Sequence, residues 1–180
     1  MKILFLALLT SLFAGCASTP PPENLLSELH PGDRIHVHFR SVGWQHNVAY
    51  TFDFQRGART TVRIASLGRA WSPYTPGFDT QPPHLLGTLT LSPRDIRGLD
   101  RLWQFYRTHP DGFCSTVDDI TIKYPAYRDD HSEPVIVTER YTDLSGDTFR
   151  LPGLTTLPAL ARRLEWRSYR TLQKSPPHTP

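Results

Sequence analysis

Residues 35–40 read IHVHFR, a strict alternation of apolar and polar side chains. Successive side chains of a β-strand point to opposite faces of a sheet, so this pattern predicts a strand with one buried and one exposed face. The same alternation returns in residues 48–54 and in residues 60–64, each time after a short polar segment. Together the three segments predict a meander of antiparallel strands.

A helix signal follows at Ser92-Pro93-Arg94-Asp95. Ser92 can cap a helix, Pro93 suits the first turn, and Asp95 faces the exposed amide groups of that turn. The apolar residues that follow fall on one helical stripe, namely Ile96, Leu99, Leu102, Trp103 and Tyr106. The pattern predicts a helix that ends before Pro110.

The remaining periodic segments complete the expected fold. Leu89 and Leu91 indicate a short fourth strand, and residues 120–124 and 135–141 indicate a fifth and a sixth strand paired as a hairpin. A short helix is expected after Thr155 or Thr156, with its leucines turned inward. We therefore predict an α+β fold, a mainly antiparallel sheet of about six strands with two helices packed on one face.

A proline-rich insert at residues 66–85 has no periodicity. A structureless loop of this length is unusual in a compact domain and is often functional. Its Trp71, Tyr74 and Phe78 either pack onto the domain or contact a partner, and Trp44 lies in the turn after the first strand. Large aromatic side chains dominate protein interfaces, so these four are the candidate partner-binding residues.

The N-terminal residues predict export. A positive start at Met1-Lys2 precedes an apolar run at 3–13, which is too short to span a bilayer as a helix. The run ends in Phe13-Ala14-Gly15-Cys16, and this segment resembles the signal peptide and lipobox of bacterial lipoprotein precursors. An ordinary secretory signal peptide that ends near a cysteine is the alternative.

The lipoprotein resemblance implies a covalent membrane anchor. Cys16 would receive a diacylglyceryl thioether, the peptide would be cut before it, and its new amino group is often acylated. Two or three acyl chains hold a protein stably on a bilayer. In that family, an aspartate directly after the cysteine favours retention in the inner membrane. Ala17 stands at this position, so the resemblance implies a lipid-anchored protein of the cell envelope, at the outer membrane and facing the periplasm.

The resulting organisation has one domain. Residues 1–15 form the signal peptide, and residues 16–30 the lipidated N-terminus with a flexible tether. The single α+β domain occupies residues 31–173, and residues 174–180 form a disordered tail. Cys16 is used by lipid, so Cys114 has no intramolecular partner left, and we expect it to be a small buried side chain.

Charge limits the partners. The chain has 20 Lys and Arg against 17 Asp and Glu, a net charge of +3. The basic residues are nearly all arginine, which forms forked bonds to carboxylates and phosphates. They are scattered, and no nucleic-acid-binding module is present. We expect the membrane, through the lipid on Cys16, and an envelope protein as partners, and no nucleic acid.

Two groups of residues could carry chemistry. His36 and His38 project from one face of their strand, and with His46 they could ligate zinc or copper. Cys114 with His131 could form a nucleophile and base, helped by the nearby Asp118 and Asp119, although adjacent aspartates point apart on a strand. No nucleophile elbow, phosphate loop or dinucleotide motif occurs. We expect no catalytic residue, metal or cofactor.

The order of elements is similar to that of emfourin-type inhibitors of bacterial metallopeptidases. The matching segments are residues 35–54, 89–106, 120–141 and 154–164, although Gly43-Trp44 stands where that family has a glycine pair. The resemblance implies a tethered peptidase inhibitor. Our expectation is a non-enzymatic binding module, with that inhibitor, or a metal-binding or hydrolytic enzyme, as alternatives.

Overall fold

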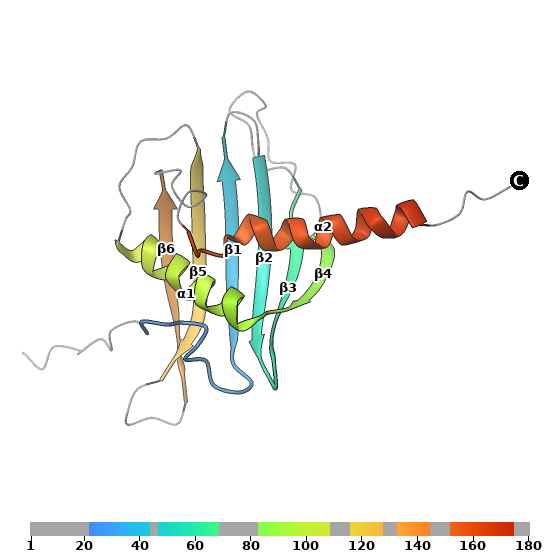
Figure 1. Ribbon diagram of the computed structural model, residues 1–180. Helices are drawn as coiled ribbons and strands as arrows, with labels where there is room; N and C mark the ends of the chain where they lie inside the picture. Colours follow the sequence, from blue (N-terminus) through green and yellow to red (C-terminus); the bar gives the residue numbers. More distant parts are fainter. Residues whose placement is uncertain are drawn as a thin grey trace, which may run out of the picture.

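The computed structural model describes residues 22–43, 47–68, 83–108, 116–127, 133–144 and 152–174. They form a six-stranded sheet and two helices (Figure 1). The strands are β1 (Arg34–Val42), β2 (Asn47–Arg56), β3 (Thr60–Ser66), β4 (His84–Thr90), β5 (Val117–Ala126) and β6 (Val135–Asp143), and the helices are α1 (Pro93–Thr108) and α2 (Leu157–Lys174). The strand order is β4-β3-β2-β1-β5-β6, and every neighbouring pair is antiparallel. The predicted α+β class is confirmed.

The alternation in β1 sets the register of the sheet. Val37 lies opposite Phe52 of β2 on one side and Ile122 of β5 on the other. Because both partner strands alternate in the same phase, their apolar side chains share one face. Both helices cross that face (Figure 1). The sheet thus has one face covered by helices and one face that no described segment covers.

One hydrophobic cluster fills the space between the sheet and the helices. Trp103 of α1 is fully buried and meets Phe54 of β2 edge to face at 6.4 Å between ring centroids. The other buried helix residues include Leu99, Leu102, Leu157, Leu160, Ala161 and Leu164. These are the stripes that helical periodicity predicted.

The predicted helix start at Ser92 is confirmed by a reciprocal cap. Asp95 N donates to Ser92 Oγ at 3.1 Å, and Ser92 N donates to Asp95 Oδ2 at 3.0 Å. Thr156 caps α2, because its Oγ1 accepts a hydrogen bond from Ala159 N at 3.4 Å. This helix runs to Lys174 and is longer than predicted.

The segment at 22–30 departs from the expected flexible tether. Leu25, Leu26 and Leu29 are buried in the main core. Asp100 of α1 accepts a hydrogen bond from Leu26 N at 2.7 Å and another from the Ser27 hydroxyl at 2.5 Å. The domain therefore begins no later than Pro22, and only residues 16–21 of the predicted tether, which lie outside the described residues, remain to link Cys16 to it.

The insert is also shorter than predicted. Ser66 ends β3, and His84 and Leu85 belong to β4, so the part outside the described residues is 69–82. The sequence of β4 does not alternate regularly because the strand is irregular. Its register with β3 shifts between Ile64 and Ala65, and its Gly87 has a φ of 142°. Within the described residues, no helix is long and apolar enough to cross a membrane.

Candidate functional site

The open face of the sheet carries the candidate site. It holds the side chains that alternate with the core residues, and most of them are exposed. Its charged residues are unbalanced in sign. The basic residues are Arg34, Arg40, Arg63, Lys123 and Arg140, and the acidic residues are Asp53 and Asp119. This uncovered surface is therefore more basic than the chain as a whole.

One row of charged residues crosses the middle of this face. Asp53 of β2 lies opposite Arg63 of β3 and opposite His36 of β1, which lies opposite Lys123 of β5. His36 Nδ1 and Asp53 Oδ1 are 2.6 Å apart, and both side chains are about half exposed. Asp53 thus contacts His36 and lies opposite Arg63 in the register of the sheet. Lys123 at the other end of the row has no carboxylate opposite it on β1.

A second row is centred on His38. Its neighbours across the strands are Thr51 and Thr121, and Thr121 lies opposite Arg140 of β6. Burial lowers the pKa of His38, and the charges of His36 and Arg40 lower it further, against a smaller opposing effect of Asp119. His38 is therefore a mainly neutral hydrogen-bonding group at neutral pH.

The structure bears on only part of the hypothesis that His36, His38 and His46 bind a metal ion. His36 and His38 do project from the open face, as predicted. Among the described residues, no group of three or more His, Cys, Asp or Glu side chains is close enough to hold a metal ion. His46 lies outside the described residues, so the three-histidine site stays a prediction.

The covered face holds an ionic cluster that sequence reasoning missed. Glu139 of β6 forms a two-pronged ion pair with Arg107 of α1, with N–O distances of 3.0 Å and 3.2 Å. Tyr124 donates to Glu139 Oε1 at 2.5 Å, and Tyr141 donates to Oε2. Only 13% of the Glu139 side chain is exposed. The signal in the sequence was a glutamate at an inward position of an alternating strand.

The electrostatics of this cluster favour a structural role. Burial raises the pKa of Glu139, but the hydrogen bonds from Arg107, Tyr124 and Tyr141 outweigh it, so the pKa is lowered overall. Burial and the bond to Glu139 raise the pKa of Tyr141 to about 12. Every acceptor position of the carboxylate already has a donor. The cluster fastens α1 to the sheet.

The two adjacent aspartates of β5 point to opposite faces, as predicted. Asp118 is buried on the covered face, where it accepts a hydrogen bond from the Ser41 hydroxyl at 2.5 Å. Its partner across the strands is Asp143, the last residue of β6, which is also buried. Asp119 lies on the open face. The proposed reactive pair, Cys114 and His131, lies outside the described residues.

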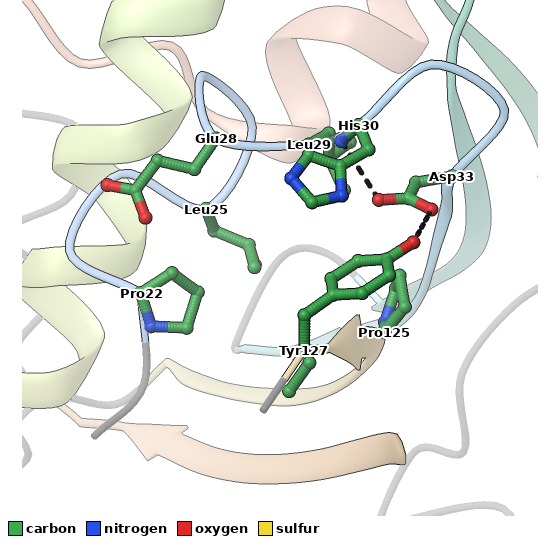
Figure 2. Close-up of a pocket in the computed structure, with 9 residues that line it drawn as sticks. Pro22, Leu25, Glu28, Leu29, His30, Asp33, Pro125 and Tyr127 are labelled. Carbon is green, nitrogen blue, oxygen red and sulfur yellow. Dashed lines mark hydrogen bonds between the residues drawn. The ribbon is translucent and has the colours of Figure 1, made fainter. Parts of the chain in front are cut away.

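A pocket lies where the N-terminal segment passes the end of β5 (Figure 2). Its volume is about 440 Å³, and it is lined by Pro22, Leu25, Glu28, Leu29, His30, Asp33, Pro125, Ala126 and Tyr127. The Tyr127 hydroxyl donates to Asp33 Oδ1 at 2.5 Å, and its ring lies 4.4 Å from the ring of His30. The Asp33 carboxylate also accepts from His30 N. The polar groups of His30, Asp33 and Tyr127 are thus paired with one another, whereas Glu28 Oε1 accepts a hydrogen bond from Asn24 N at 3.0 Å.

The predicted partner-binding residues lie outside the described residues. These residues are Trp44, Trp71, Tyr74 and Phe78. The predicted lipidation site, Cys16, also lies outside the described residues. The ends of the two aromatic segments are described, however. Val42 pairs with Asn47, and Ser66 pairs with His84, so both loops leave the same end of the sheet on neighbouring hairpins.

Comparisons with protein-family models, with curated proteins and with solved structures found no significant match. The resemblances to lipoprotein precursors and to emfourin-type inhibitors therefore stay predictions, and the function rests on the geometry of the site.

Proposed function

We propose that this chain is a lipid-anchored protein of the bacterial cell envelope whose domain is a non-enzymatic binding module. Its binding surface is the open face of the sheet, and its partner is an envelope protein with an acidic surface. The observation that carries the proposal is the excess of arginine and lysine on a sheet face that no described segment covers. The chemistry of arginine supports it, because a guanidinium pairs with a carboxylate through two hydrogen bonds.

The distribution of charge suits recognition more than catalysis. A surface of one sign speeds the encounter with a partner of the opposite sign and rejects partners of the same sign. Asp53 contacts His36 on this surface, and Lys123 and Arg140, which are both exposed, are the residues that we propose bind the partner. The aromatic side chains at residues 44 and 71–78, which we predict to bind a partner, would add apolar contacts at the end of the sheet from which the two loops leave.

The membrane anchor is part of the same proposal. It rests on the apolar run and on Ala14-Gly15-Cys16. Mass spectrometry of the membrane-extracted protein tests it, with Cys16→Ser as the control. The acylated mass is expected only for the unsubstituted protein, and an unlipidated mature mass for that protein would contradict the anchor.

Charge reversal tests the binding surface. The double variant Lys123→Glu/Arg140→Glu changes two exposed side chains of the open face, and Arg97→Glu/Arg101→Glu makes the same change of charge on exposed positions of α1. Capture from solubilised envelopes is compared at low and high salt. We expect the open-face variant alone to lose its partner, and the wild-type complex to weaken as salt screens the charges. Equal capture by both variants would contradict the proposal.

A further inference from the structure

The basal end of the domain is the end closer to the point at which the anchor segment departs. We define it by Pro125–Tyr127, Val135 and Ile136. Pro22 and Pro125 line the same pocket (Figure 2). Ala126 pairs with Val135 across the β5–β6 hairpin. The Pro22 carbonyl accepts a hydrogen bond from Arg107 at 2.5 Å. Because Arg107 also binds Glu139 at the middle of β6, Pro22 lies between the basal end and the middle of the sheet.

The remaining link to Cys16 is short compared with the domain. Fully extended, the chain from Cys16 to Pro22 reaches at most roughly 20 Å. β5 has 10 residues and spans about 30 Å from one end of the sheet to the other. The link is thus shorter than the sheet, and a lipid on Cys16 keeps the domain close to the bilayer. The link allows the basal end, or one side of the domain, to lie there.

Of the four large apolar side chains that are exposed among the described residues, two lie at the basal end, and the other two are Leu85 of β4 and Trp166 of α2. Val135 and Ile136 are adjacent, 48% and 64% exposed, and belong to the basal end. Their strand partners Ala126 and Pro125 line the pocket, whereas the two leucines of its lining are buried. An exposed apolar patch on a protein marks a surface that contacts a partner or a membrane. The short link allows Val135 and Ile136 to reach the lipid.

We infer that the basal end docks on the surface of the lipid bilayer, with Val135 and Ile136 in contact with the head-group region. The inference rests on the lipidation of Cys16 in the proposed function and adds the orientation of the domain. The strands then stand upright on the membrane, and the open face is turned sideways toward a partner. Glu28 and Asp33 lie at the basal end, so the contact draws on apolar area and the short link rather than on anionic lipid.

Chemical coupling separates this inference from lipidation in the cell. The mature chain from Cys16, carrying Cys114→Ala, is coupled through the Cys16 thiol to a maleimide phospholipid. The vesicles contain phosphatidylethanolamine and phosphatidylglycerol, so a domain that lies flat on its basic face would also be stabilised. Hydrogen–deuterium exchange is compared for coupled and free protein. We expect the backbone amides of residues 126–127 and 135–137 to exchange roughly tenfold more slowly when coupled, and those of 84–86 to be unchanged.

Two matched substitutions test the apolar contact. Ile136→Ser and Leu85→Ser both replace an exposed aliphatic side chain at a sheet edge, at opposite ends of the domain. We expect Ile136→Ser to abolish most of the basal protection and Leu85→Ser to leave it intact. Protection spread along the open-face strands would show a domain lying flat and would overturn the inference. So would full basal protection in Ile136→Ser, or no protection in the coupled wild-type protein.

Discussion

The two faces of the sheet are built from alternate residues of the same strands, yet different physical demands select them. The covered face is filled by side chains whose shapes fit two helices, and Val37, Phe52 and Ile122 are fully buried in one row. The open face is selected by charge and hydrogen bonding. Both faces hold exceptions, among them the buried carboxylates of Glu139 and Asp118 on the covered face and, on the open face, His38, whose pKa is lowered by burial. The covered face therefore supplies most of the stability, and the open face is the one for which we propose a binding role.

The largest effect should come from the centre of the covered face. Trp103→Ala removes a fully buried ring from between α1 and β2. We expect a loss of about 3–5 kcal/mol in the free energy of unfolding, because the cavity would only partly close. Lys123→Ala, on the open face, is the matched control and should change it by less than about 0.5 kcal/mol. Urea unfolding measures both, and similar losses would mean that the two faces do not differ in this way.

The next effect comes from the charge on the covered face. Glu139→Gln keeps the shape but removes the charge that Arg107 and two tyrosines bind. Removing one partner of a buried ion pair leaves the other uncompensated, so we expect a loss of about 3 kcal/mol at pH 7.

The pH dependence of this loss follows from the lowered pKa of Glu139. A carboxylate whose pKa is lower in the folded state stabilises the protein above its unfolded pKa, and this contribution is lost as the pH falls through the folded value. The difference between wild type and Glu139→Gln should therefore shrink below about pH 4.5. A difference that stayed constant from pH 7 to pH 3 would show that the ionised carboxylate is not the stabilising group.

A smaller effect tests how closely the covering layer fits. A Cβ on Gly98 of α1 would come within 2.7 Å of the Thr155 backbone nitrogen, just before α2. Alanine usually favours a helix, but here it must push the two segments apart, and we expect a net loss of about 1–3 kcal/mol. Gly57→Ala, in the turn after β2, meets no atom closer than 3.6 Å and is the control. Stabilisation by Gly98→Ala would show that the layer is loosely packed.

The sequence predicted which side chains lie on each face of the sheet better than it predicted the contacts between segments far apart in the chain. Alternation in 35–40 is a local property, so the class of fold and the exposure of His36 and His38 could be predicted from it. The segment at residues 22–30 is held on the domain by a hydrogen bond to Asp100, which lies far along the chain. No local sequence pattern predicts that contact. The charged row through Asp53 required the register of four strands, which single-strand patterns do not define.

The smallest effect concerns the exception on the open face. Burial lowers the pKa of His38, so the folded state takes up its proton at a lower pH than the unfolded chain does. Between the ordinary value of 6.5 and the lowered folded value, the unfolded state binds more protons, and stability falls as the pH falls. In His38→Thr this contribution is absent. The variant should therefore lose less stability than the wild type on acidification from pH 7.5 to about pH 5, with the difference appearing below about pH 6.5. Thr121→Ala is the control, because it changes a neighbour in the same row without removing a titrating group. Thermal melting at a series of pH values measures all three proteins. If the wild type and His38→Thr lose stability in parallel, His38 is as well solvated as an ordinary surface histidine. The open face would then be uniformly hydrated, and the contrast between the two faces would be sharper than the structure indicates.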